Sequence, residues 1–356
     1  MARFAGMRPT PLRARLCPRH VVTACAVSAA LAAPALAQPT TSSAKPQLVV
    51  LLTVDQLRPD YLVRWESEFT GGFKRLLDRG AFFTNALHDH ATTETAPGHA
   101  TLGSGRFPRH TNIVRNEVGV GDPQSPLIDG GRGGGASPWR FRGTALVDWM
   151  RDRDQWTRGL SVSRKDRGAI LPMGRAQQAA YWYSTDGRFV TSSYYADTLP
   201  TWVKAFNGRD FIAALDGAQW TTLRSAASYP ERDDVARENG GRDFTFPHVL
   251  PAERARRASQ LTEYPVMDSI TVQFALAGVT AMELGARTST DFLGVSLSTT
   301  DAVGHRYGPN SRELHDQVLR VDRYLGQLMD SLFRLRDSTR ILFALSADHG
   351  VAPYPE

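Results

Sequence analysis

Three apolar runs in this chain each end in an aspartate. They cover residues 48–55, 292–301 and 341–348 and end at Asp55, Asp301 and Asp348. Short unbroken runs rich in Val, Ile and Leu are typical of buried parallel strands. In open α/β sheets the ligand site lies just beyond the carboxyl ends of such strands. We therefore expect three carboxylates that are far apart in the sequence to meet at one edge of a sheet.

Histidines accompany two of these aspartates. His305 follows Asp301 by four residues, and His349 follows Asp348 directly. Carboxylate oxygen and imidazole nitrogen together are ligands that suit zinc or a similar divalent metal. A single aspartate in such a place more often caps a strand or the next helix. Three aspartates with two histidines favour a metal site instead.

A hydroxyl group stands where a nucleophile would be useful. Thr95 lies just before Pro97, at the predicted start of a helix. A helix N-terminus offers free amide groups and the positive end of a dipole, which bind phosphate and favour an ionised hydroxyl. A nearby metal would add to this effect. The alternative is that Thr95 only caps the helix, as threonine often does.

Two basic residues could hold an anion. Lys165 and Arg167 are two apart, so in an extended segment they would point the same way. Two cations on one face suit the non-bridging oxygens of a phosphate group. The alternative is a solvated basic turn.

The first 37 residues have the pattern of an export signal. Five arginines and no acid precede a stretch of small apolar residues from 21 to 33, and Ala35-Leu36-Ala37 precedes Gln38 as a cleavage site. The apolar stretch is too short to span a bilayer permanently. We expect a signal peptide over residues 1–37, a periplasmic or secreted protein, and no stable membrane anchor.

The charge balance changes once this signal is set aside. The whole chain has 42 basic and 36 acidic residues, and without the five arginines 37 basic residues remain. A nearly neutral protein gives no general case for binding nucleic acid. Both cysteines, Cys17 and Cys25, also lie in the signal, so any metal ligands of the mature protein must be oxygen or nitrogen.

The remaining elements complete an α/β pattern. A short helix is predicted at 72–79, a strand at 81–87, and a long helix from Asn310, an N-cap with Glu313 three residues on. The apolar residues of this long helix keep a four-three spacing, which makes one stripe. The helix leads into the run that ends at Asp348, and strand, helix and strand make a right-handed parallel crossover.

We therefore expect a doubly wound, mostly parallel sheet flanked by helices. Residues 38–118 and 289–356 should form its core. Residues 119–288, where the pattern changes and a glycine-rich loop occurs at 130–135, should form an inserted cap subdomain that carries the Lys/Arg pair. The chain stops at Glu356, eight residues after Asp348 and close to the predicted active edge. The C-terminal part of the fold is thus expected to be missing.

Seven segments carry a resemblance to a known family. They are VDQLRPDYL, GGFKRLLDRGAFFTNA, TTETAPGHATLGSG, IVRNE, SRKDRGAILPMG, STTDAVGHRYGP and SADHG. In these segments and their order, the chain resembles the alkaline phosphatase superfamily, on the branch with a threonine nucleophile. That branch includes the nucleotide pyrophosphatase/phosphodiesterases, and the closest likeness is to the PafA-type alkaline phosphatases.

The resemblance implies a site with two Zn²⁺ ions. Asp301 and His305 would bind one ion with a further histidine, and Asp55, Asp348 and His349 would bind the other, with Thr95 beside both. In the family pattern the further histidine lies C-terminal to the SADHG segment, and no histidine follows it in this chain. His88, His90 and His99 lie on other segments of the pattern.

The resemblance also implies a reaction. Thr95 would attack phosphorus and form a covalent phosphothreonine, which water then hydrolyses. Asn116, Lys165 and Arg167 would hold the phosphoryl oxygens. A monoester carries one more negative charge than a diester, so the Lys/Arg pair favours small phosphate monoesters as substrates. The alternatives are a type I phosphodiesterase or nucleotide pyrophosphatase, and a truncated, impaired fragment that only binds phosphate.

Overall fold

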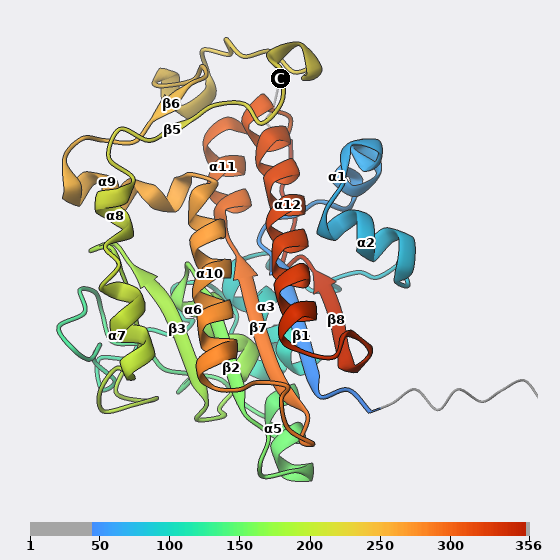
Figure 1. The fold of residues 1–356 in the computed structure, drawn as a ribbon, viewed down its shortest axis with the longest axis vertical. Helices are drawn as coiled ribbons and strands as arrows, with labels where there is room; N and C mark the ends of the chain where they lie inside the picture. The colour runs from blue at the N-terminus through green and yellow to red at the C-terminus, as the bar shows by residue number, and fades with distance from the viewer. Residues whose placement is uncertain (1–44, 354–356) are drawn as a thin grey trace, which may run out of the picture. The chain divides into compact units, whose positions relative to one another are not determined.

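The computed structural model describes residues 45–353, and a six-stranded sheet lies at the centre of this range (Figure 1). Its order is β4-β3-β2-β7-β1-β8. The strands are β1 (Leu48–Val54), β2 (Gly159–Ser163), β3 (Ala179–Ser184), β4 (Arg188–Val190), β7 (Asp291–Leu297) and β8 (Ile341–Ser346). All neighbours pair in parallel except β3 and β4. The predicted α/β class with a mostly parallel sheet is confirmed.

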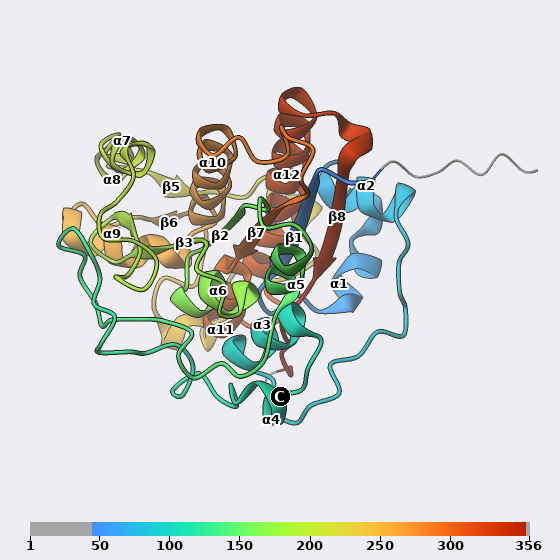
Figure 2. The same ribbon diagram turned by 90° about the horizontal axis from the view of Figure 1, so that it is seen from below.

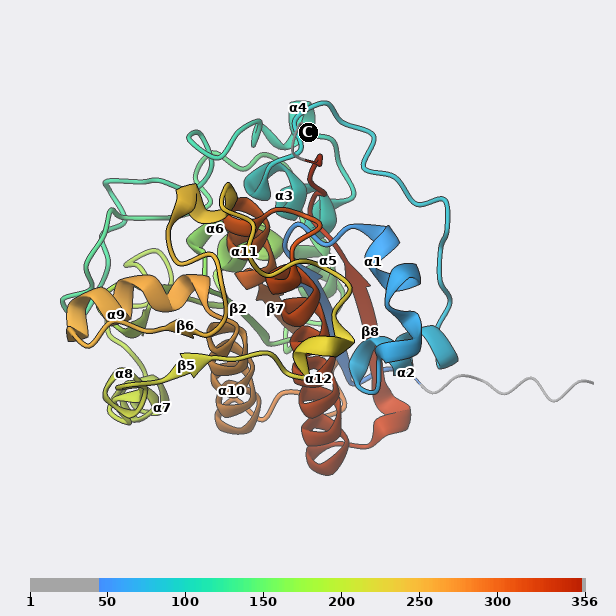
Figure 3. The same ribbon diagram turned by 90° about the horizontal axis from the view of Figure 1, so that it is seen from above.

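Helices cover both faces of this sheet. Seen from below, α10 and α12 lie on one side, and α3, α5 and α6 lie on the other (Figure 2). The helices are α1 (Pro59–Arg64), α2 (Gly72–Arg79), α3 (Thr95–Ser104), α4 (Pro108–Thr111), α5 (Leu146–Arg153), α6 (Asp166–Ile170), α7 (Thr201–Asn207), α8 (Phe211–Ala214), α9 (Arg254–Gln260), α10 (Val266–Ala281), α11 (Thr299–Tyr307) and α12 (Arg312–Leu335). A small sheet of β5 (Gln219–Trp220) and β6 (His248–Val249) lies above the main sheet (Figure 3).

The core follows the predicted apolar patterns. All seven residues of β7 are buried, as a central strand covered on both faces requires. The stripe on α12 is buried at Leu314, Val318, Val321, Leu325, Leu328 and Leu332. The helix begins one residue later than predicted, because the N-cap is Ser311, whose side chain accepts a hydrogen bond from the Leu314 amide.

Two expectations about the chain's organisation are wrong. Residues 81–87 form no strand with any part of residues 45–353. Their large side chains Phe82, Phe83 and Leu87 are exposed, so they do not pack against a sheet. Residues 119–288 are not a single insert, because β2, β3 and β4 belong to the main sheet. The segment between β4 and β7 leaves this sheet and carries β5 and β6.

The described residues also bear on membrane insertion. Across residues 45–353, none of the helices combines the length and apolar character that a membrane span needs. The predicted signal peptide and its cleavage site lie outside the described residues.

A buried glutamate in the segment between β4 and β7 makes the stability of the fold depend on pH. Glu238 is 5% exposed, and burial, with the nearby charge of Glu313, raises its pKa to about 8. Below about pH 4 this carboxyl is protonated in both the folded and the unfolded protein, and its contribution to stability is fully present. As pH rises, ionisation favours the unfolded state, and the contribution is lost by the time pH has passed about 8.

We expect Glu238→Gln to raise the melting temperature relative to wild type at pH 9, by about 2 °C or more, and to matter much less at pH 5. Thermal denaturation across this range measures the difference. Glu117→Gln, at a side chain that is 74% exposed, is the matched control. A pH-independent difference for Glu238→Gln would contradict the assignment.

Candidate functional site

The register of the sheet explains how distant residues meet. Ser163, Ser296, Thr53 and Ser346 are paired across four neighbouring strands and form one row. Asp55, Lys165 and Asp348 each lie two residues beyond this row. Because parallel strands end at the same edge, these three side chains are brought together just outside the sheet.

Asp55, Asp348 and His349 form a compact group of metal-ligand type. One ligand atom from each lies within 4.8 Å of the others, and all three residues are buried. His349 Nε2 lies 3.3 Å from Asp55 Oδ1 and 3.9 Å from Asp348 Oδ2. Both Asp55 oxygens and Asp348 Oδ2 are buried, and they face nitrogens of Lys165, His349 and His99. Such a donor set fits a divalent cation such as Zn²⁺.

Lys165 lies at the centre of the cluster. Its Nζ is 2.6 Å from Asp55 Oδ2 and 2.7 Å from Asp301 Oδ2, and it donates a hydrogen bond of 3.0 Å to Thr95 Oγ1. The side chain is 7% exposed. One ammonium group thus connects two predicted metal ligands with the predicted nucleophile.

Asp301 and His305 stand beside this group, although not where the sequence placed them. The strand ends at Leu297, and Asp301 is the third residue of α11 rather than the end of β7. One helical turn brings His305 Nε2 to 3.2 Å from Asp301 Oδ1. His349 Nε2 lies 3.9 Å from the same oxygen. The two predicted ligand sets are therefore adjacent.

Thr95 is presented by the N-terminus of α3. It is the first residue of the helix and is buried, while the N-cap position is taken by Glu94. The interpretation that Thr95 itself caps the helix is thus not supported. Asn116 Oδ1 accepts a 2.8 Å hydrogen bond from the Ala96 amide, which places Asn116 beside Thr95.

Close packing holds α3 against the cluster. A Cβ added to Gly98 would lie 2.2 Å from the backbone oxygen of Asp348, so only glycine permits this approach. The sequence TAPGHA therefore combines a nucleophile position with the space that its helix needs.

Arg167 is not brought into the cluster. Its guanidinium Nη1 lies 3.5 Å from Asp166 Oδ1, and the side chain is 27% exposed. The expectation that Lys165 and Arg167 point the same way from an extended segment is wrong, because α6 begins at Asp166 and Lys165 is its N-cap residue. A helical turn there separates the two side chains.

Electrostatics keep the carboxyl groups ionised. Burial opposes ionisation of Asp55, but Lys165 and His349 outweigh it and hold its pKa well below the usual value. Burial and Asp55 likewise oppose ionisation of Asp301, and His305 and Lys165 still lower its pKa. Burial alone would lower the pKa of His349, but its hydrogen bond to Asp55 and the charge of Asp348 raise it to about 9. The site concentrates negative charge that cations must balance.

Sequence reasoning missed three residues that contact the cluster. Gln56 Nε2 donates a 3.0 Å hydrogen bond to Asp301 Oδ1. His99, fully buried, has Nδ1 at 3.0 Å from Asp348 Oδ2. Arg164 Nη2 lies 3.9 Å from Asp301 Oδ2. Gln56 directly follows Asp55 in the sequence, and Arg164 directly precedes Lys165. This adjacency was the signal from which their contacts could have been predicted. The contact of His99 depends on how α3 packs.

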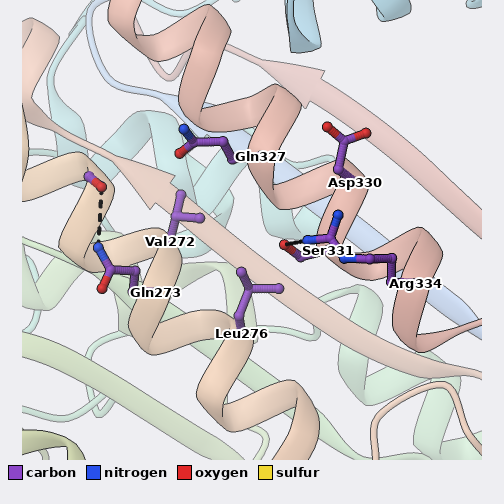
Figure 4. A pocket seen from close by; sticks show the side chains of 8 residues that line it. Val272, Gln273, Leu276, Gln327, Asp330, Ser331 and Arg334 are labelled. Atoms are coloured by element: carbon purple, nitrogen blue, oxygen red, sulfur yellow. Dashed lines mark hydrogen bonds between the residues drawn. The ribbon is translucent and has the colours of Figure 1, made fainter.

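A cavity elsewhere does not belong to this site. It has a volume of about 420 Å³ and lies between α10 and α12 (Figure 4). Its polar side chains pair locally: Gln273 donates to Ser269, and Arg334 donates to Ser331. None of the cluster residues lines it.

Comparison with known proteins agrees with this arrangement. A family model described as type I phosphodiesterase / nucleotide pyrophosphatase matches residues 49–356. The chain belongs to this family. Alkaline phosphatase PhoV of Synechococcus elongatus is 36% identical over 88% of this chain and 60% of that protein. Alkaline phosphatase PafA of Elizabethkingia meningoseptica is 35% identical over 89% of this chain and 62% of that protein.

A solved structure shares the fold. The crystal structure of wild-type alkaline phosphatase PafA superposes with a TM-score of 0.82 at 35% identity, covering 87% of this chain and 64% of that chain. The chain thus spans about 60% of the length of the curated relatives it matches. The predicted fold and the predicted family are both confirmed.

Proposed function

We propose that the protein is a periplasmic alkaline phosphatase that hydrolyses small phosphate monoesters. The observation that carries the proposal is the contact of Lys165 Nζ with Thr95 Oγ1, Asp55 and Asp301. This contact supports the proposal because the Thr95 hydroxyl, the Lys165 ammonium and two carboxylates lie together in one cluster. The names of the relatives PhoV and PafA support the same reaction class.

Thr95 Oγ1 is the proposed nucleophile. It loses its proton and forms a bond to phosphorus while the bond between phosphorus and the leaving oxygen breaks, and the leaving oxygen takes up a proton to give the product alcohol. The Lys165 ammonium, which donates to Oγ1, stabilises negative charge on that oxygen. Water then attacks the phosphothreonine and returns the hydroxyl of Thr95 with release of phosphate.

The N-terminus of α3 and its neighbours bind the phosphoryl group. Free amides at the start of a helix and its dipole favour an anion there. The backbone amide of Asn116 donates to Glu94 Oε2 at 2.7 Å, and its side-chain Oδ1 accepts from the Ala96 amide. These two hydrogen bonds fix the position of Asn116 before substrate arrives. Such preorganised groups stabilise charge that develops in the transition state.

Asp55, Asp348 and His349 would hold one divalent cation, and Asp301 and His305 would contribute to a second. When bound, two Zn²⁺ ions supply positive charge that polarises the phosphate and favours the ionised form of the nucleophile. The buried carboxylates of Asp55 and Asp348, which face cationic or imidazole nitrogens, support this proposal.

A second candidate is a type I phosphodiesterase or nucleotide pyrophosphatase. The pairing of Arg167 with Asp166 at 3.5 Å favours it, because a diester needs fewer cations around its oxygens. The ratio of monoester to diester turnover separates the two candidates.

Hydrolysis of p-nitrophenyl phosphate by the purified protein tests the proposal. We expect activity at neutral to alkaline pH that a chelator abolishes and Zn²⁺ restores. Metal analysis should find one tightly held ion, assigned to Asp55, Asp348 and His349, and a weaker second ion, because within residues 45–353 we assign two ligands to it, Asp301 and His305. Activity that persists in chelator, or two equally tight ions, would contradict this assignment.

A further inference from the structure

Gln56 connects the two groups of predicted metal ligands. It follows Asp55 at the end of β1 and is 2% exposed. Its backbone amide donates to Asp348 Oδ1 at 3.1 Å, and its side-chain Nε2 donates to Asp301 Oδ1 at 3.0 Å. One residue therefore contacts a carboxylate from each group.

The backbone of Gln56 adopts an unfavourable conformation to make these contacts. Its φ angle is +65°, in the left-handed region that residues with a Cβ seldom occupy. Strain of this kind persists only where the surroundings enforce it, and it concentrates at functional sites. Here the hydrogen bond from the Gln56 amide to Asp348 holds the turn in place.

A glycine on α11 makes room for the Gln56 carboxamide. A Cβ added to Gly304 would lie 2.0 Å from Gln56 Oε1. The three atoms nearest to such a Cβ all belong to the Gln56 carboxamide. Within five residues, α11 thus carries the two predicted ligands Asp301 and His305 and the glycine that leaves space for Gln56.

We propose that Gln56 is a positioning residue that fixes the Asp301 carboxylate for a divalent cation, and that Gly304 provides the space it requires. The inference rests on the metal site of the proposed function. Groups that hydrogen-bond to a metal-ligating carboxylate orient it, and their loss weakens metal binding. Because the Gln56 side chain contacts Asp301, its effect falls on the cation held by Asp301 and His305.

Gln56→Gly separates this role from a merely structural one. Glycine accepts a φ of +65° without strain, so the melting temperature of the metal-free protein should not fall through the backbone. Zn²⁺ titration against a chromogenic chelator should show the weaker ion bound about 10–100-fold less tightly, with the tighter ion unchanged. Turnover should drop at limiting Zn²⁺ and recover at saturating Zn²⁺.

Gly304→Ala tests the same contact from the other side. Alanine suits a helix interior, so the substitution acts by displacing the Gln56 carboxamide. We expect the same selective loss of Zn²⁺ affinity. In the double variant Gln56→Gly/Gly304→Ala the loss should be no greater than in either single variant, because the clash disappears with the side chain.

Two results would overturn the inference. One is a Zn²⁺ affinity within about twofold of wild type in both single variants, which falls short of the expected effect. The other is a double variant in which the two losses multiply. A wild type that binds Zn²⁺ yet hydrolyses no phosphate ester would reject the proposed function instead, and the titration of the variants would still decide the role of Gln56.

Discussion

Replacing Thr95 with alanine should reduce phosphatase turnover by at least about 10³-fold and abolish the covalent phosphoenzyme, since loss of a nucleophile in other hydrolases costs about 10⁴–10⁶. Without Oγ1, Lys165 Nζ loses the hydroxyl that it contacts at the N-terminus of α3, although the helix and the carboxylates stay. Rapid quenching with radiolabelled substrate, followed by detection of acid-stable phosphoprotein, measures the intermediate directly.

A matched control lies on the same helix. Thr101→Ala removes the same atoms nearly two turns further along α3 and should leave turnover close to wild type. Thr95→Ser keeps a hydroxyl and should retain a measurable phosphoenzyme. A labelled intermediate in Thr95→Ala would show that another group attacks phosphorus, and the assignment of Thr95 would then be wrong.

Removing the Lys165 ammonium should lower kcat/KM for a phosphate monoester by about 10²–10³-fold, the usual effect of losing one well-placed charge-stabilising group. A methyl diester, which carries less charge, should lose less. Arg167→Ala should have a smaller effect than Lys165→Ala, because Arg167 pairs with Asp166 and is partly exposed.

Both substrates must be measured with each variant. Lys74→Ala, at a side chain that is 45% exposed, is the control for loss of a lysine. An equal loss on monoester and diester in Lys165→Ala would show that Lys165 serves to organise Asp55 and Asp301 rather than to select substrate charge. A larger loss in Arg167→Ala would show that Arg167 moves toward the phosphate when substrate binds.

The sequence predicted β1 and β7 because they are central and apolar strands of the sheet. The runs ending near Asp55 and Asp348 became β1 and β8, and the stripe of α12 became buried. In β1, β7 and α12 the apolar pattern agrees with burial, whereas β8 lies at the edge of the described sheet and is only partly buried. The convergence of Asp55 and Asp348 followed from strand direction alone.

Prediction failed where tertiary contacts decide the outcome. Residues 81–87 have the composition of a strand, but strand formation needs a partner, and none of residues 45–353 pairs with them. Asp301 extends an apolar run in sequence, yet the chain turns into α11 after Leu297. The φ of Gln56 and the approach of His99 to Asp348 depend on packing between distant segments, which a local pattern does not encode.

The aligned row of Ser163, Ser296, Thr53 and Ser346 limits how this chain can evolve in length. Deleting or inserting one residue within β1 would turn every following side chain to the opposite face and move Asp55 away from Lys165. The same change in the exposed segment 80–87 would alter only the path of a surface loop. Length differences among relatives should therefore gather in such connections, while the four strands and the two residues after each keep a constant length.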